Sequence, residues 1–332
     1  MPNRIQKFLF MIRKFKKDVT RSRIIYELAQ DIHSSHLGEY YFIMTEEMML
    51  AGHSQNYYFD DEGIPIIPSY IDVDDQKMVY YPISIGQYGL AIWNTYLRTN
   101  SREDRNRFLK IVEWFYNNKI EDAQIGVYWL TYVDKPAYKI EKPWKSAFSQ
   151  ARGINILLRG YQLTGKSQYF EAAHKALYPF KYQVKEGGIT TFTEFGPFYE
   201  EYPSKEIPVL VLNGMIFSLC GVYDFLRLQP DNKLAKSIFD DGVNTLVGLL
   251  PLFDLGFWSK YSLCEAPFHP KVDPASIGYH HLHIIQLELM YRLTEKVIFK
   301  EFAIRWKSYV NAFNISRMYY LKLKALRKLN RI

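Results

Sequence analysis

Residues 146–178 read SAFSQARGINILLRGYQLTGKSQYFEAAHKALY, and the architecture that we predict for the whole chain follows from this stretch. Its first half, residues 146–163, is apolar on most sides, which is typical of a fully buried helix. Its second half, about 167–178, has helical periodicity with one polar face. Thr164-Gly165-Lys166 between the halves indicates a tight connection. The stretch therefore predicts a hairpin of one inner and one outer helix.

The same pattern recurs along the chain. Tyr96, Tyr161, Tyr223 and Tyr291 close four apolar helical stretches and are spaced 62 to 68 residues apart, about the length of two connected helices. We expect inner helices at 84–97, 146–163, 209–226 and 280–293. The outer helices are expected at about 102–118, 167–178, 231–249 and 297–309. This alternation predicts a mainly α protein, an α/α toroid of the incomplete (α/α)6-type barrel, with a cleft where the inner helices begin.

The connections between these helix pairs are long and contain β-prone residues. Segments 126–131, 189–194 and 257–263 predict short strands or hairpins. Segment 50–82 contains several Gly and Pro residues and predicts an extended loop or a small hairpin. We divide the chain into a basic N-terminal helical segment at 1-50, a toroid domain at 51-310 and a basic C-terminal helical extension at 311-332.

Composition narrows the classes of function. Aromatic residues make up 17% of the 332 residues, and sugar-binding clefts use such rings to pack on the C–H face of a pyranose, although many rings simply form the core. Cys220 and Cys264 form neither a disulfide framework nor a CxxC metal motif, which fits a reducing, cytoplasmic location. We expect no metal and no cofactor.

The net charge of +7 is concentrated at the two ends of the chain. Residues 1–25 and 305–332 hold eight Lys or Arg each, so 26 of the 42 basic and 34 of the 35 acidic residues lie between them. No recognition motif accompanies this charge, which argues against nucleic-acid binding. We expect neither a secretory signal nor a membrane-spanning segment, because the apolar runs are short.

The sequence predicts a helix in each basic end of the chain. The pattern does not decide what each helix packs against. Segment 5–17 fits either a helix on an anionic membrane surface or one that packs on its own domain. Segment 315–332 fits either membrane contact or packing against a partner subunit in a homodimer. Membrane association of a cytoplasmic protein is therefore one of the open alternatives.

Three motifs hold residues suited to sugar chemistry: Tyr199-Glu200-Glu201-Tyr202-Pro203, Phe253-Asp254-Leu255-Gly256 with Tyr261 beyond it, and Tyr279-His280-His281-Leu282-His283. The first precedes one inner helix and the last begins another. Both should therefore face the same cleft.

These motifs are part of a wider resemblance. Six stretches in order, over about residues 60–309, resemble the heparan-type D-glucuronyl C5-epimerases, particularly their C-terminal helical domain. The stretches are 81–90, 144–161, 199–203 with 212–214, 250–254, 279–287 and 299–309. The resemblance implies the toroid fold and a cofactor-free isomerase that converts D-glucuronate to L-iduronate units of an oligo- or polysaccharide.

This reaction determines which residues are needed. C5 of a uronic acid carries a hydrogen beside a carboxylate, so inversion needs a base, an opposed acid and a partner for the carboxylate. By resemblance, Glu201 and Tyr279 are the opposed proton-transfer groups, with Tyr202 and Tyr261 assisting. Tyrosine suits this role if cations lower its pKa, and glutamate if burial raises its pKa. Residues that suit carboxylate or hydroxyl binding are His280, His283, Asn213, Gln87, Gln150 and Arg152.

Other interpretations of these residues stay open. Glu200-Glu201 also fits a solvated acidic pair, the amides fit cross-links between inner helices, and Arg152 fits a structural ion pair. The chain departs from the family by lacking its β-sandwich domain, and by having Cys264 where the family has an Arg, for which Lys260 or a histidine could substitute. A uronate polysaccharide lyase and a non-catalytic glycan-binding or assembly protein are the competing functions.

Overall fold

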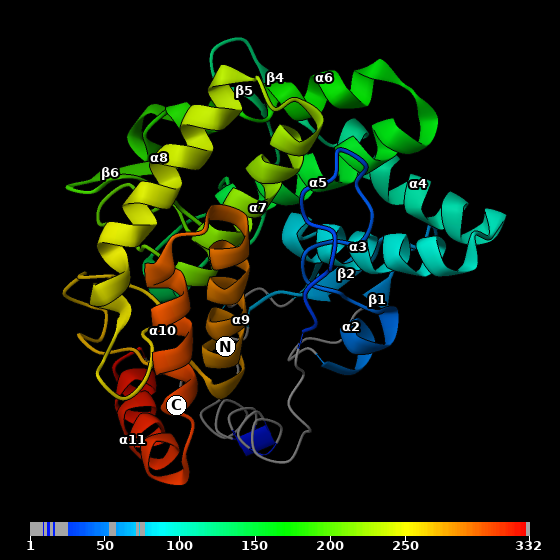
Figure 1. The fold of residues 1–332 in the computed structure, drawn as a ribbon. Helices are drawn as coiled ribbons and strands as arrows, with labels where there is room; N and C mark the ends of the chain where they lie inside the picture. Colours follow the sequence, from blue (N-terminus) through cyan, green and yellow to red (C-terminus); the bar gives the residue numbers. More distant parts are fainter. Residues whose placement is uncertain are drawn as a thin grey trace.

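The computed structural model describes residues 26–52, 58–70, 73 and 77–329, together with residues 9, 12, 13 and 16. Four helical hairpins follow one another around an arc (Figure 1). They are, in chain order, α3 (Pro82–Thr99) with α4 (Arg102–Asn117), α5 (Ala147–Thr164) with α6 (Ser167–Lys175), α7 (Leu212–Leu228) with α8 (Lys233–Leu249), and α9 (Ile277–Thr294) with α10 (Val297–Ser308). The predicted helix pairs are confirmed.

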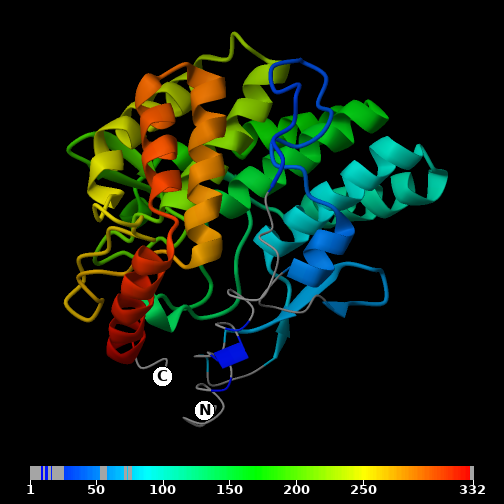
Figure 2. The ribbon, with the colours of Figure 1, turned by 60° about the horizontal axis from the view of Figure 1, so that its bottom comes forward.

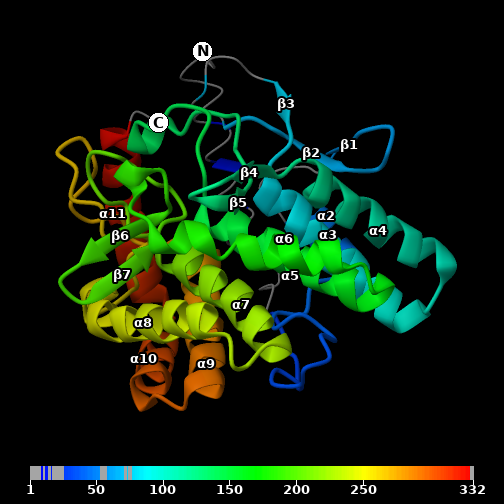
Figure 3. The same cartoon turned by 90° about the horizontal axis from the view of Figure 1, so that it is seen from above.

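Burial separates the inner from the outer helices, as the sequence pattern predicts. Helix α5 is buried without interruption from Ala147 to Gly160. The outer helix α4, in contrast, buries only one stripe, formed by Phe108, Ile111, Val112 and Phe115. The inner helices contact one another in the order α3, α5, α7 and α9, and Figure 3 shows the pairs placed side by side from α3 to α10. The mainly α toroid with an incomplete ring is confirmed.

An N-terminal segment, residues 26–45, connects the inner helices to one another. The side chains of Trp93 on α3, Arg227 on α7 and Arg292 on α9 each donate a hydrogen bond to a backbone carbonyl of this segment, at 2.9, 2.6 and 3.0 Å. Figure 2 shows the segment as the dark blue trace between α9 and α3. Phe42 is buried, and its ring centre lies 5.2 Å from that of Phe217 on α7. The segment thus completes the core that the four hairpins leave open.

Short strands lie in the long connections. β1 (Tyr58–Phe59), β2 (Pro65–Pro68) and β3 (Met78–Val79) form a three-stranded antiparallel sheet within the segment that we expected to be a loop or hairpin. β4 (Ile120–Asp122) pairs with β5 (Gly126–Tyr128), and β6 (Thr190–Thr193) pairs with β7 (Gly196–Tyr199). The strands expected near 126–131 and 189–194 are confirmed.

The prediction of a strand at 257–263 is wrong. Ser259, Lys260 and Ser262 each form a single bridge, with Asp254, Pro274 and Val211 respectively. Because these partners come from three different segments, no ladder continues beyond one residue, and Pro274 has no N–H to donate. The segment therefore links its neighbours through isolated bridges instead of a continuous strand.

The remaining elements lie at the ends and in turns. α2 (Glu46–Gly52), which the pattern missed, precedes the small sheet, and α11 (Ala312–Lys328) confirms the predicted C-terminal helix. Short 3-10 turns occur at η1 (Pro136–Tyr138), η2 (Tyr178–Lys181), η3 (Val184–Glu186) and η4 (Leu250–Phe253). The helix expected at 5–17 lies outside the described residues apart from four isolated positions. Among the described residues, none of the helices has the length and apolar character to cross a bilayer.

Two glycines show how closely the inner helices approach. A Cβ added to Gly221 on α7 would lie 2.5 Å from Cα of Ala151 on α5, a backbone atom that cannot move aside. Gly278, in the first turn of α9, has open space around the same position. The contact between α5 and α7 therefore requires glycine, whereas the start of α9 does not.

We predict that Gly221→Ala lowers the free energy of unfolding by about 1–3 kcal/mol, because the added methyl group overpacks the joint between the helices. Gly278→Ala is the matched control, and it should leave stability unchanged or raise it by up to about 1 kcal/mol. Urea denaturation of both variants measures the difference. Equal stability of the two variants would contradict the described packing of α5 on α7.

Candidate active site

Glu201 lies in the loop between β7 and α7, and its side chain is enclosed by protein. The residue is 4% exposed. Asn213, in the first turn of α7, donates from Nδ2 to Oε2 of Glu201 at 3.3 Å. A Cβ on the neighbouring Gly214 would lie only 2.5 Å from Oε2, so glycine is needed for this helix to approach the carboxylate. The start of α7 therefore fixes the carboxyl group in position.

Enclosure raises the pKa of this carboxyl group. Burial raises the pKa of Glu201 to about 7 from an ordinary value of 4.5. A hydrogen bond from Tyr202, the positive charge of Lys135 and the amide of Asn213 each oppose this rise. Burial disfavours the charged form more strongly than these partners favour it. Around pH 7 both protonation states of Glu201 are therefore populated.

Four phenols lie within the electrostatic reach of this carboxylate: Tyr81, Tyr202, Tyr261 and Tyr279. Burial is the largest cause that raises the pKa of each hydroxyl, and the charge of Glu201 raises all four further. Tyrosine would act as a base if a nearby cation lowered the pKa of its hydroxyl. The pKa of these four hydroxyls is raised instead, so this condition is not met. These tyrosines are therefore protonated at neutral pH and can donate.

Tyr279 is the member of this group that solvent reaches most. It lies in the first turn of α9, whose N-cap residue Ser276 accepts a hydrogen bond from the Tyr279 backbone N–H at 3.4 Å. The residue is 37% exposed, whereas Tyr202 is buried. Its ring centre lies 4.9 Å from that of Tyr261 at an interplanar angle of 64°. Tyr279 is therefore the tyrosine of this group that lies nearest to the surface, although its hydroxyl is buried.

Lys135 supplies positive charge to the cluster, and no sequence motif predicts this role. The residue is buried, and its Nζ lies 3.5 Å from the ring centre of Tyr70 and 4.6 Å from that of Tyr202. Tyr70 in turn donates from its hydroxyl to that of Tyr81 at 2.9 Å. In the sequence, Lys135 is a single lysine before Pro136 in a connection between helix pairs, and no motif includes it. Its proximity to Glu201 depends on tertiary structure.

Aromatic stacking extends the cluster away from Glu201. The ring of Tyr138 stacks on Tyr202 on one side and on His269 on the other, with centre distances of 5.3 and 5.4 Å. Trp144 packs against Tyr202 at 5.7 Å. These rings hold Tyr202 in place and form an aromatic wall that the motifs did not reveal.

Glu200, the neighbour of Glu201, holds the loop together. It is fully buried and accepts from the Thr191 hydroxyl at 2.9 Å and from the backbone N–H groups of Val209 and Leu210 at 3.2 and 3.0 Å. Burial raises its pKa to about 7 as well. The interpretation of Glu200-Glu201 as a solvated acidic pair is wrong, because neither side chain faces water.

His280 and His283 do not reach the cluster, which corrects their expected role as substrate contacts. Both are fully buried. Nδ1 of each ring lies within hydrogen-bonding distance of Ser259 Oγ, at 2.8 and 3.0 Å, and His280 stacks on Trp258 at 3.8 Å. Burial lowers the pKa of His280 to about 3. These neutral rings fasten α9 to the preceding loop.

Gln150 and Arg152 also belong to the core, so their expected contact with substrate is corrected. Gln150 donates from Nε2 to the carbonyls of Val127 and Ala176 at 2.8 and 3.0 Å. Arg152 is fully buried and donates from Nη1 to the Tyr40 hydroxyl at 2.8 Å. Gln150 thus links α5 to β5 and to the end of α6, and Arg152 binds a phenol of the N-terminal segment instead of forming the expected ion pair. Of the six candidates, Asn213 alone contacts Glu201.

Two further expectations concern Gln87 and the family arginine position. Gln87 lies half-buried on α3, and within the described part of the chain it makes no hydrogen bond to the cluster. Cys264 is 8% exposed and has a raised pKa, caused first by burial, so it supplies no charge. The cation whose charge acts on Glu201 is Lys135. Among the described residues, no group of three His, Cys, Asp or Glu side chains is placed to hold a metal.

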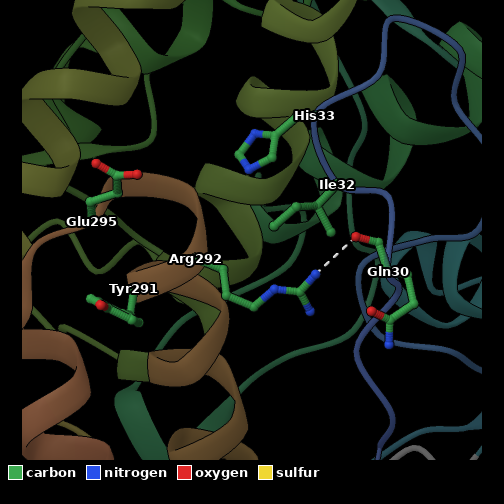
Figure 4. A pocket seen from close by; sticks show the side chains of 6 residues that line it. All are labelled: Gln30, Ile32, His33, Tyr291, Arg292 and Glu295. Atoms are coloured by element: carbon green, nitrogen blue, oxygen red, sulfur yellow. Dashed lines mark hydrogen bonds between the residues drawn. The ribbon is translucent and has the colours of Figure 1, made fainter.

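A hollow elsewhere in the molecule is not connected with this chemistry. It has a volume of about 250 Å³ and is lined by Gln30, Ile32, His33, Tyr291, Arg292 and Glu295. Figure 4 shows Arg292 reaching across it to the backbone of Gln30. Its residues come from segment 26–45 and the C-terminal end of α9, whereas Tyr279 lies at the opposite end of that helix. We therefore place the candidate site at Glu201.

The raised pKa of Glu201 predicts a pH-dependent cost in stability. Stabilisation from the protonated form is complete below pH 4.5 and is lost as the pH rises through about 7. Glu201→Gln removes this loss, so its free energy of unfolding should exceed that of the wild type by up to about 3 kcal/mol at pH 8 and by little at pH 4.5. Denaturant titrations at both pH values measure the difference. Glu206→Gln, an exposed change on the same loop, is the control, and a pH-independent difference for Glu201→Gln would contradict the prediction.

Comparison with known proteins gives matches to a family of epimerases and to a protein without an assigned function. The family model described as D-glucuronyl C5-epimerase C-terminus matches residues 122–308. D-glucuronyl C5-epimerase of Caenorhabditis elegans is 26% identical over 238 residues, which are 68% of this chain and 38% of the relative. An uncharacterized protein of Methanocaldococcus jannaschii is 29% identical over 185 residues, 54% of this chain and 57% of that protein. The chain thus spans well under two thirds of the length of either relative.

The fold has a counterpart among solved structures. Cellobiose 2-epimerase from Spirochaeta thermophila superimposes with a TM-score of 0.50 at 12% identity, covering 75% of this chain and 70% of that one. At this identity the likeness concerns the fold, and it agrees with the α/α toroid described above. Since the matched family model spans more than half of the chain, the protein belongs to the family defined by the C-terminal domain of D-glucuronyl C5-epimerases.

Proposed function

We propose that this protein is a carbohydrate epimerase that inverts C5 of D-glucuronate units in a glycan to give L-iduronate. The observation that carries the proposal is the enclosed Glu201 carboxyl group, whose pKa of about 7 suits proton abstraction at neutral pH, among phenols that remain protonated. Family membership supports the same class of reaction. The reaction removes one proton from C5 and adds one proton to it, so it requires no redox partner.

We assign different roles to the two proton-transfer groups. The Glu201 carboxylate removes the C5 proton from one face of the ring. Tyr279, whose pKa is raised by burial and by the charge of Glu201, supplies a proton from the other face. After turnover the Glu201 carboxyl group gives up its proton, and the Tyr279 phenolate, whose pKa is raised, takes one up, so no net proton is gained or lost. Tyr202 hydrogen-bonds Glu201 and keeps the carboxylate oriented.

The carbanion at C5 lies beside the carboxylate of the sugar, so it forms only if that negative charge is stabilised. Lys135 is the cation of the cluster, buried against Tyr202 and electrostatically coupled to Glu201. We assign it to the uronate carboxylate, in place of the arginine that the family has at the position of Cys264. A charge in this partly enclosed setting acts more strongly than one in water.

The direct test incubates the protein with a glucuronate polymer in deuterated buffer and follows C5 by NMR. Deuterium at C5 together with iduronate signals is the expected result. Unsaturated, ultraviolet-absorbing ends would instead indicate a lyase, which abstracts the same proton and then expels the substituent at C4. If neither product forms, the proposal is contradicted, and a glycan-binding or assembly role remains as the alternative.

Glu201→Gln and Tyr279→Phe should each lower the rate of C5 deuterium exchange by a factor of about 100 or more, because each removes one proton-transfer group. The matched control is Glu206→Gln, which changes an exposed carboxylate five residues from Glu201. The control should retain the wild-type rate. Undiminished exchange in both site variants, with correct folding verified by circular dichroism, would refute the assignment.

Lys135→Met should change the pH profile as well as the rate. The exchange rate of the wild type should rise with pH through a midpoint near 7, as Glu201 ionises. Because Lys135 lowers the pKa of Glu201, its removal should move this midpoint to higher pH. The double variant with Lys135→Met and Cys264→Arg should recover part of the lost rate. An unchanged midpoint in Lys135→Met would contradict the role of this lysine.

A further inference from the structure

Helix α11 packs through one face on the segment between α8 and α9. Met318, Ala325 and Leu326 on that face are buried. Two of its lysines bind the loop before α9: Lys322 donates to the Asp273 carboxylate at 2.6 Å, and Lys328 donates to the His269 carbonyl at 2.7 Å. Since His269 stacks on Tyr138, and Tyr138 on Tyr202, a continuous set of contacts joins α11 to the candidate site. Figure 2 shows α11, in red, beyond α10 at the margin of the molecule.

The opposite face of α11 exposes large apolar side chains. Phe313 is 76% exposed, Tyr320 59% and Leu323 48%. Their spacing of seven and three residues places all three on one side of the helix. Phe313 is the most exposed large apolar residue of the described chain. Exposed apolar residues on one side of an amphipathic helix indicate a surface that meets an apolar phase or a partner.

Cations lie on this same face, and acids do not. Lys324 and Arg327 are exposed and alternate with the apolar residues at helical spacing. Arg317 is exposed as well, but its guanidinium lies 3.9 Å from the ring centre of the buried Phe257. Lys324 Nζ lies 4.3 Å from the ring centre of Tyr320. Residues 305–332 contain no Asp or Glu at all. Helix α10, in contrast, carries Glu301 among its exposed lysines.

We propose that this face of α11, comprising Phe313, Tyr320, Leu323, Lys324 and Arg327, docks on an anionic lipid surface. Apolar and aromatic side chains enter the interfacial layer while cations attract anionic head groups. A soluble polyanion such as an acidic glycan would use the cations but would gain little from Phe313 and Leu323. The lipid surface therefore accounts for more of the face. The proposal does not depend on the function proposed above.

The experiment measures sedimentation of the purified full-length protein with vesicles of phosphatidylcholine, with and without phosphatidylglycerol. The wild type should bind the anionic vesicles and release them at high salt. Lys324→Glu with Arg327→Glu should weaken binding by about 25-fold or more, since each lost cation accounts for a factor of about five. Phe313→Ser with Leu323→Ser should also weaken it. Melting curves establish that each variant is folded.

The matched control lies on α10. Lys300→Glu with Lys307→Glu makes the same change in net charge on another exposed helix, and Lys300 also lies over a tyrosine ring, 5.2 Å from the centre of Tyr291. This control should bind anionic vesicles as the wild type does. Equal losses in the α10 and α11 variants would overturn the proposal, because binding would then follow net charge alone. Binding of a soluble glucuronate polymer that depends on α11, without vesicle binding, would overturn it as well.

Discussion

The enclosed carboxyl group of Glu201 is the constraint to which the surrounding structure is adapted. Removing a carboxylate from water is costly, and the protein compensates only in part, with one phenol, one amide and one lysine. The remaining imbalance is what keeps the pKa of this group near 7. A fully compensated carboxylate would be a weaker base, and an uncompensated one would stay protonated. The partial compensation is thus the property that suits Glu201 to move a proton.

The scaffold maintains this imbalance by close packing. Glycine at 214 lets α7 approach the carboxylate, and glycine at 221 lets the same helix lie against α5. Glu200 fixes the loop from the other side through three accepted hydrogen bonds. His280 and His283 fasten the start of α9, which carries Tyr279. Glu201 and Tyr279 are therefore positioned by different helices of one packed arc.

Much of the fold could be predicted from the sequence because its period is long and regular. The inner helices are apolar on every side and the outer ones on one side, and that contrast depends only on local residue order. The strand expected at 257–263 failed because its bridging partners come from three separate segments. The central role of segment 26–45 was likewise not predictable, since its bonds join residues more than 50 positions apart.

Site residues that belong to a sequence motif could be predicted. Site residues that only the tertiary structure brings together could not. Glu201, Tyr202, Tyr261 and Tyr279 followed from the family resemblance, and they gather around one carboxylate. Arg152 and the two histidines have suitable chemistry but point into the core, which residue type alone does not reveal. Lys135 has no motif, and only the folded chain places it beside Glu201.

A single titration examines the physical basis of this account. Carbon-13 NMR of protein labelled at the glutamate carboxyl groups, with the Glu201 signal assigned by its absence in Glu201→Gln, gives the pKa of this group directly. The account predicts a midpoint near 7. A midpoint near the ordinary 4.5 would mean that the carboxylate is solvated or fully paired, and the proposed proton transfer would lose its base.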